Sequence, residues 1–190
     1  MSHIETPPDH RFPWYVRLFL ANQRRRYGRE LEPARLWGRS PKVFAGLSLL
    51  YGALDRKSSP IEPALRTLIT VLISQINWCA FCVDINSATG LKRGLTAAHL
   101  AALREFEVSP LFDERIKAAL AYTAAVTKNE MNANLMARLK THFNDDAIIE
   151  LTALIAFQNL SSKFNSALDV AAQGFCNIPP SSNSKADNQG

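Results

Sequence analysis

Apolar residues recur along most of this chain at intervals of three and four positions, the spacing that places them on one face of a helix. The segment containing Leu65, Leu68 and Leu72 shows this spacing clearly. Prolines, polar capping residues and glycines interrupt the pattern where helices begin and end. The pattern predicts about eight helices, over residues 13–26, 41–55, 62–76, 78–90, 96–103, 113–126, 133–143 and 145–173.

Length and composition favour one helical domain. A chain of 190 residues with 47% hydrophobic content can bury a core of its own, and only 8 glycines and no long β-branched run argue against a sheet. Residues 1–10 and 177–190 are polar and rich in Pro or Ser, and we expect them to be disordered. The prediction is an all-α, single-domain helical bundle over residues 11–176.

The charge pattern gives little evidence for a nucleic-acid or membrane partner. The net charge is +5, and the three consecutive arginines at 24–26 are accompanied by no recognition motif, so we do not expect nucleic-acid binding. Helix 13–26 combines aromatic residues with these arginines, a composition that suits an anionic membrane surface. Packing of its aromatic residues on the core is the interpretation we favour. Without a signal-peptide pattern or a membrane-length apolar run, we expect a cytoplasmic protein.

The candidate chemistry lies in Cys79-Ala80-Phe81-Cys82. Two thiols three positions apart at the start of a helix can face the same way and close a disulfide reversibly. The positive end of the helix dipole lowers the pKa of a thiol placed there. We expect Asn77 to cap this helix by accepting from its free N–H groups. The motif therefore predicts a redox-active dithiol.

Other interpretations of the cysteine pair are weaker. A zinc site needs two more ligands, but Cys176, His99 and His142 are isolated, so we expect neither a metal nor a cofactor. Three cysteines without a signal peptide do not fit a secreted disulfide scaffold. An inert, buried pair is the main alternative. Cys176 itself is either an incidental thiol near the end of the last helix or a third redox thiol.

Several segments carry a resemblance to a known family. The most specific is 71–82, which continues into Val83-Asp84-Ile85-Asn86; the others are 36–41, 62–68, 109–112, 118–122, 142–143, 148–152 and Asn159. Together they resemble the carboxymuconolactone decarboxylase superfamily, in its alkyl hydroperoxidase D-like branch. The likeness covers most of residues 33–173. It divides the domain into an N-terminal helical extension, 11–58, and a core, 59–176.

The resemblance implies an all-helical homo-oligomer, often a trimer or hexamer. Members of the dithiol branch reduce peroxides or exchange electrons with thiol and lipoyl proteins. By match, Cys82 is the nucleophilic thiol and Cys79 the resolving thiol. The branch without a C-x-x-C motif carries out decarboxylation, which makes that activity the least favoured alternative here.

The chain departs from the family pattern at two positions. Thr67 stands where the branch has a glutamate, and Asn86 where it has the histidine of the same proton relay. Asn86 follows Cys82 by four residues and so shares its helix face, but a neutral amide accepts no proton. Asp84, the nearest carboxylate, is offset by two residues, and we interpret it as structural. We therefore expect a thiol–disulfide oxidoreductase with weak peroxidase activity, or else a non-catalytic redox sensor or scaffold.

Overall fold

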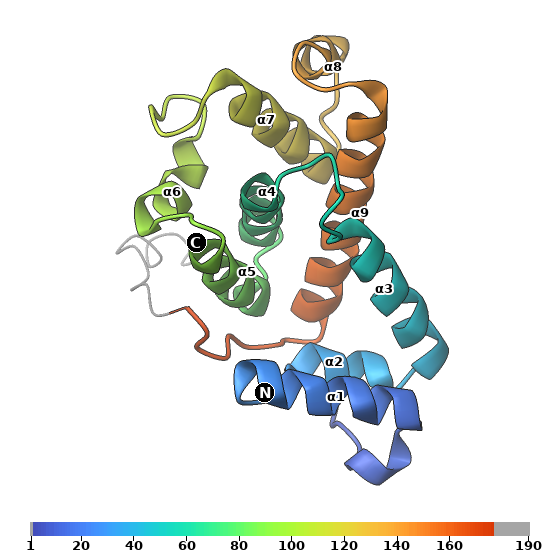
Figure 1. Cartoon of the computed structure of the whole chain (residues 1–190). Coiled ribbons are helices and arrows are strands. Elements are labelled where there is room, and N and C mark those ends of the chain that lie inside the picture. The colour runs from blue at the N-terminus through green and yellow to red at the C-terminus, as the bar shows by residue number, and fades with distance from the viewer. Residues whose placement is uncertain (1, 177–190) are drawn as a thin grey trace, which may run out of the picture.

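The computed structural model describes residues 2–176, and within this range every regular element is a helix (Figure 1). The α-helices are α1 (Trp14–Tyr27), α2 (Glu32–Gly38), α3 (Pro41–Leu54), α4 (Pro63–Ile76), α5 (Ala80–Lys92), α6 (Ala97–Ala102), α7 (Glu114–Lys128), α8 (Ala133–Lys140) and α9 (Asp145–Ala167). Two 3-10 turns, η1 (Asp9–Arg11) and η2 (Leu103–Glu105), complete the order. The predicted all-α class is confirmed. The predicted disordered tail, 177–190, lies outside the described residues.

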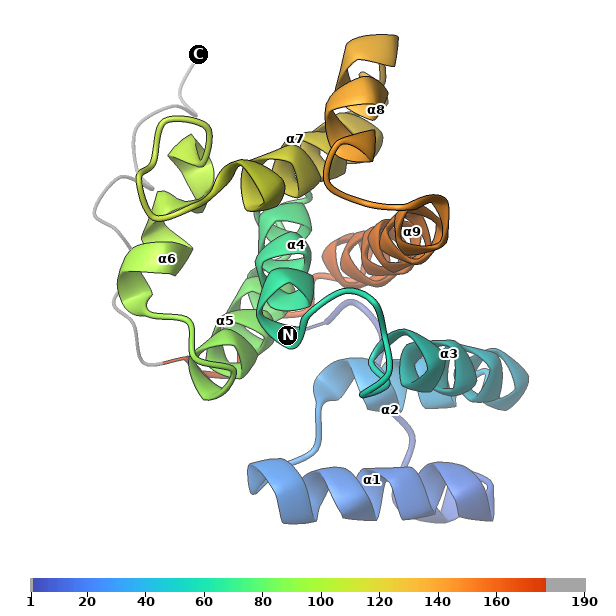
Figure 2. The ribbon, with the colours of Figure 1, turned by 45° about the horizontal axis from the view of Figure 1, so that its top comes forward.

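Helix α4 forms the centre of the molecule. Figures 1 and 2 show it enclosed by α5, α7 and α9. From Leu65 to Ser74 every residue of this helix except Thr70 is buried, so α4 is covered on all sides. Leu68, Ile69, Val71 and Ile73 are each at most 2% exposed. Burial of one such side chain stabilises the fold by about 1.5–3 kcal/mol. The contacts of α4 with α5, α7 and α9 therefore contribute much of the stability of the bundle.

The first three helices form a smaller core beside this bundle. Val16 and Leu20 of α1 pack with Phe12, Ala34 and Phe44, and the resulting layer lies along the edge of the bundle (Figure 2). These contacts fit the packing role favoured for the first helix, although Trp14 and Leu18 remain exposed. Among the described residues, no helix is long and apolar enough to cross a membrane.

Helix α2 is an element that the sequence pattern does not predict. Its seven residues make about two turns, too short for a 3.6-residue period to be recognised. Pro33 occupies the first turn, where its missing N–H costs nothing, and Leu36 is buried on the inner face. The helix is therefore held by tertiary packing rather than by its own propensity.

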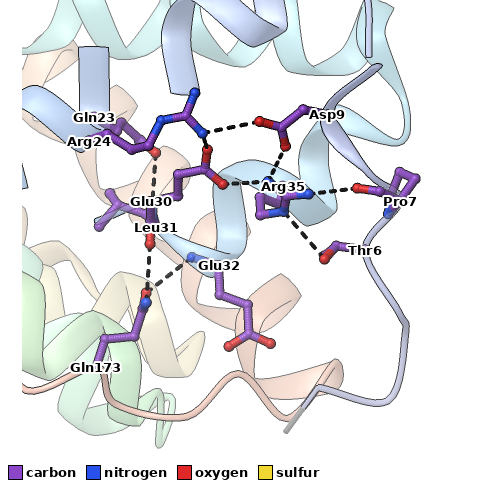
Figure 3. Close-up of polar contacts among 10 residues, drawn as sticks. All are labelled: Thr6, Pro7, Asp9, Gln23, Arg24, Glu30, Leu31, Glu32, Arg35 and Gln173. Atoms are coloured by element: carbon purple, nitrogen blue, oxygen red, sulfur yellow. Dashed lines mark hydrogen bonds and ion pairs between the residues drawn. The ribbon is translucent and has the colours of Figure 1, made fainter. Parts of the chain in front are cut away.

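Arg35 of α2 anchors the segment that precedes α1, including part of the region expected to be disordered. Its guanidinium donates to the Pro7 carbonyl and the Asp9 carboxylate at 2.6 Å each, and to Glu30 (Figure 3). These bonds lower the pKa of Asp9, with Arg35 as the largest cause and Arg24 as the next. Residues 2–10 thus contact the body of the protein.

The segment after α9 is joined to the first two helices by Gln173. Its side chain accepts from the Glu32 N–H at 3.0 Å and donates to the Glu30 carbonyl at 3.2 Å (Figure 3). Leu31 is held in turn by Gln23, whose oxygen accepts its N–H at 3.2 Å. The two ends of the described chain therefore close over the same side of the bundle.

Several predicted helix ends are wrong: the helix predicted over 133–143 already ends at Lys140, and α7 continues past 126 to Lys128. The last helix stops at Ala167, not near residue 173, because Asp169 adopts a left-handed conformation and the Val170 N–H donates to the Asn165 carbonyl at 3.0 Å. This is a Schellman motif, closed by the buried side chain of Val170. In contrast, α5 continues through Gly90 to Lys92, and a Cβ at Gly90 would lie only 3.1 Å from side-chain atoms of Thr67 and Leu95, so the glycine allows close packing within the helix.

Candidate redox site

The turn between α4 and α5 sets the position of the two cysteines. Asn77 does not cap α5 as predicted: it ends α4, and its amide donates to Asn159 and Ser162 of α9 at 2.8 Å each. The residue that caps α5 is Cys79, whose sulfur accepts the Cys82 N–H at 3.1 Å. Trp78, between them, has a φ of 53° and is 88% exposed. The sulfur itself thus takes the capping role predicted for the asparagine.

Cys79 and Cys82 form a disulfide, with their Cα atoms 5.2 Å apart. This separation lies within the usual range for the bond, about 4.4–6.8 Å. Both residues are at most 2% exposed and pack with Leu36, Phe81 and Val170. The spacing in sequence and the geometry of the turn therefore agree on a C-x-x-C pair that can exist as a disulfide.

A cavity of about 320 Å³ reaches Cys82. Cys82 lines this cavity, and Cys79 is not among the described residues that do so. The walls come from the N-terminal helices as well as from α4, α5 and α9. The aromatic residues in them are Phe19, Tyr27, Trp37, Phe44, Tyr51, Phe81 and Phe157. A small molecule in the cavity would thus meet the Cys82 side of the dithiol and mostly apolar walls.

Asn165 contacts the Cys82 sulfur directly. Its Nδ2 donates to the Cys82 Sγ at 3.2 Å, and its side chain is almost completely buried. Its Oδ1 is buried without a hydrogen-bond partner in the described part of the chain. Sequence reasoning missed this residue, which lies 83 positions after Cys82 in an apolar helix. An amide donor at this distance favours the thiolate over the thiol when the pair is reduced.

The two positions of the missing proton relay also line the cavity. Asn86 donates to the Ser74 hydroxyl at 3.2 Å, and Gln158 donates to the same hydroxyl at 3.1 Å. Thr67 donates to the Pro63 carbonyl at 3.0 Å and accepts from Arg93 at 3.3 Å. The structure thus brings Cys82, Asn86 and Thr67 to one cavity, with amide and hydroxyl groups where the family has ionisable ones.

Asp84 has a structural role away from the cavity. Its carboxylate accepts the Gln173 N–H at 2.8 Å and the Cys176 N–H at 2.7 Å, so it holds the segment after α9 against α5. These contacts fit the structural interpretation of Asp84. They also bring the Cys176 backbone beside the helix that carries Cys82, although the two residues are far apart in sequence.

Among the described residues, no group of three or more His, Cys, Asp or Glu side chains converges as metal ligands would. The polar groups near Cys82 are instead amides and hydroxyls. Together with the helical fold, they define the class of this molecule: an all-helical dithiol protein with one cysteine at a small cavity.

Comparison with known proteins places this class in a family. The model of the carboxymuconolactone decarboxylase family matches residues 41–125. Over 91% of the chain and 96% of the relative, the sequence is 43% identical to YnjA from Escherichia coli (strain K12), a protein of uncharacterised function. The chain belongs to the carboxymuconolactone decarboxylase family, and the resemblance inferred from its sequence is confirmed.

Solved structures support the same fold. A peroxidase-related protein from Ralstonia eutropha JMP134, described as having an alkylhydroperoxidase AhpD core, superposes with a TM-score of 0.79 at 22% identity, covering 92% of this chain and 94% of that one. A protein of unknown function from Agrobacterium tumefaciens gives a TM-score of 0.65 at 27% identity, covering 70% and 91%. The likeness therefore extends beyond the matched 41–125 segment and includes the helical extension.

Proposed function

We propose that this protein is a thiol–disulfide oxidoreductase that reduces an organic peroxide slowly through Cys82 and Cys79. The observation that carries the proposal is the position of the Cys82 sulfur, at the wall of a small-molecule cavity and within bonding distance of a second thiol. The AhpD-like fold supports it, because the protein from Ralstonia is described as peroxidase-related. A cytoplasmic location, in which the pair is re-reduced after each turnover, is part of the same proposal.

The reaction proceeds in two balanced steps. The Cys82 thiolate attacks the terminal oxygen of a hydroperoxide, an S–O bond forms as the O–O bond breaks, and the departing alkoxide takes a proton and leaves as an alcohol. Cys79 then attacks the sulfur of the resulting sulfenic acid, the S–S bond forms, and hydroxide leaves as water after protonation. A dithiol or lipoyl protein reduces the disulfide by exchange, which returns both thiols.

The weak point of this cycle is formation of the thiolate. Asn165 and the N-terminal end of α5 stabilise the Cys82 anion, but among the described residues at the cavity neither Asn86 nor Thr67 can take up its proton. Loss of a general base commonly costs about 10²–10⁴-fold in rate. Slow peroxide turnover near neutral pH follows, whereas exchange with a partner disulfide is less affected.

The contribution of Asn165 can be tested through the pH dependence of alkylation. In a protein that retains only the Cys82 thiol, Asn165→Ala is expected to raise the pKa of that thiol by about one to two pH units. A hydrogen bond to a charged group contributes about 1.5–3 kcal/mol, and each pH unit corresponds to about 1.4 kcal/mol. Iodoacetamide labelling followed by mass spectrometry measures the pKa.

Asn159→Ala is the matched control, because Asn159 is another amide of α9 that joins helices without contacting either sulfur. It should leave the labelling curve of Cys82 unchanged. If the Asn165 and Asn159 variants give the same curve as the parent, Asn165 does not stabilise the thiolate. Stabilisation of the Cys82 thiolate would then come from the helix dipole alone.

We also propose that the protein works as a homo-oligomer, as its resemblance to the dithiol branch implies. Helix α3 supports this, because no charged residue occurs from Val43 to Leu54 and several apolar side chains there face solvent. Leu49 is 77% exposed, and Val43, Leu50 and Tyr51 are also exposed. An apolar face of this kind marks an interaction surface, and a second copy of the chain supplies a complementary one.

Leu49→Glu is expected to shift the protein toward monomer in sedimentation velocity, because the charge would be buried in the interface without a partner. Lys42→Glu, a charge change at an exposed position of the same helix, is the control and should sediment like the parent. A parent protein that sediments as a monomer at all concentrations would exclude the oligomer.

A further inference from the structure

The cavity follows one face of α5 from the redox sulfur toward a cluster of charged residues. Cys82, Asn86, Thr89 and Arg93 all line it, at intervals of four, three and four positions. Such residues share a helix face. At a rise of 1.5 Å per residue, the Cα atoms of Cys82 and Arg93 lie about 16 Å apart along the axis. The cavity therefore has a sulfur at one end and a guanidinium at the other.

The charges at the far end are unbalanced. Arg93 donates to both oxygens of Asp55 at 2.8 Å, and Arg66 approaches the same carboxylate at 3.3 Å. Among the described residues that line the cavity, Arg26 is a third cation and Asp55 the single carboxylate. Two guanidinium groups thus share one carboxylate, which leaves one positive charge there uncompensated.

Arg66 needs a further acceptor. Its Nη1 donates to the Arg56 carbonyl at 3.0 Å and its Nη2 approaches Asp55, whereas its Nε is buried without a hydrogen-bond partner in the described part of the chain. The whole side chain is 5% exposed. A buried charged donor left unpaired destabilises a protein by more than a neutral one. The guanidinium fork is suited to a planar carboxylate, which it binds through two parallel hydrogen bonds. The excess positive charge therefore favours a monoanionic oxygen ligand at this end of the cavity.

Tyr51 adds a polar group near the same end of the cavity. Desolvation raises the pKa of its hydroxyl, and the negative charge of Asp55 raises it further. Its ring lies 5.9 Å from that of Phe157, so one face of the residue belongs to the apolar wall. At neutral pH Tyr51 is therefore an uncharged residue that adds no negative charge to oppose an anion.

The volume limits the size of the ligand. A volume of about 320 Å³ lies near the lower end of the range for small-molecule pockets, about 300–1,000 Å³. The walls of the cavity are mainly apolar, with Trp37, Leu154 and Phe157 among the residues that line it. A molecule of this size bound here must bury an apolar body and leave its charge at one end.

We infer that the cavity binds a medium-sized amphipathic carboxylic acid, with its carboxylate at Arg66 and Arg93 and its apolar body along α5 toward Cys82. One part of this inference rests on the proposed function: the end of the acid opposite its carboxylate carries the group that Cys82 reduces. Binding of the acid itself needs no redox step. The substrate class is thus an acid bearing its reducible group, such as a hydroperoxide, remote from the carboxylate.

Calorimetric titration of the oxidised protein with decanoate tests the inference, because the disulfide excludes the thiol chemistry. Decanoate is expected to bind, and 1-decanol, which has the same chain without the charge, to bind at least about tenfold more weakly, a difference of about 1.4 kcal/mol. Arg93→Gln should weaken decanoate binding about tenfold while leaving 1-decanol unchanged. Arg115→Gln is the control, because Arg115 pairs with Glu62 outside the cavity lining.

Asp55→Asn separates a ligand site from a structural ion cluster. If Arg66 and Arg93 serve an acid, removal of the competing carboxylate should tighten decanoate binding, and decanoate should raise the melting temperature of this variant more than that of the parent. Unchanged or weaker binding by a folded Asp55→Asn variant would overturn the inference, as would equal affinity of the parent for decanoate and 1-decanol.

The two proposals can fail independently. If decanoate binds as expected but Cys82 reacts with no peroxide, the acid site stands and the proposed redox function falls. If Cys82 cycles with a peroxide but decanoate does not bind, the redox function stands and the acid site is wrong.

Discussion

Cys82→Ser is expected to abolish peroxide turnover, because the serine hydroxyl is not ionised at neutral pH and has no sulfur to be oxidised to a sulfenic acid. Cys79→Ser, in contrast, should react with one equivalent of peroxide and stop, since the oxidised Cys82 has no neighbouring thiol to displace water. Turnover of the parent and of Cys82→Ser is followed with tert-butyl hydroperoxide and dithiothreitol as reductant. Cys79→Ser is treated with peroxide in the absence of added thiol, which would itself reduce a sulfenic acid, and mass spectrometry detects one added oxygen or its dimedone adduct on Cys82.

Cys176→Ser is the control for these variants. Cys176 lies close to α5 through its bond to Asp84, so it is the third thiol best placed to interfere. The assignment predicts full turnover in this variant. Loss of turnover there would make Cys176 the resolving thiol. Retained turnover in Cys82→Ser would exclude the dithiol mechanism, whereas a parent protein that does not turn over peroxide would favour a non-catalytic scaffold.

Periodicity predicted most of this fold because the long helices bury complete faces. α4 repeats its apolar positions over fourteen residues, which is enough for the period to appear in the sequence. The seven residues of α2 are not enough, and their burial depends on Phe12, Val16 and other residues of neighbouring elements. The end of α9 likewise depends on a tertiary contact, because Val170 packs against the two cysteines.

The site was predictable only where its chemistry is local. Two thiols three positions apart indicate a disulfide in any helix start, so Cys79 and Cys82 could be found by spacing. Asn165 and Arg93 could not, because their relation to Cys82 and Asp55 arises from helix packing across 83 and 38 positions of sequence. Even the cap of α5 was misassigned: Asn77 has the preferred chemistry, but it lies two residues before the capping position and bonds to α9.

Restoring the proton relay is the second large expected effect. Asn86→His alone should raise the rate of peroxide reduction, because the imidazole would stand one helical turn from Cys82 on the cavity side of α5. Adding Thr67→Glu supplies a carboxylate to orient the base, and the two changes together are expected to give about 10²–10⁴-fold. Arg93, which now donates to Thr67, will compete for the introduced carboxylate and limit the gain from the second change.

The pH profile identifies the cause of any gain. An introduced imidazole acts as a base only when neutral, so the rate in the Asn86→His variant should rise as the pH passes about 6.5. The parent rate should rise only with ionisation of the thiol itself. Thr89→His is the matched control, because Thr89 lines the same cavity one turn further from Cys82, where an imidazole cannot take the thiol proton. Equal gains in the two histidine variants would attribute the effect to added charge. No gain in a folded double variant would mean that a missing base is not what limits turnover, and exchange with a partner disulfide would then become the main reaction of this dithiol.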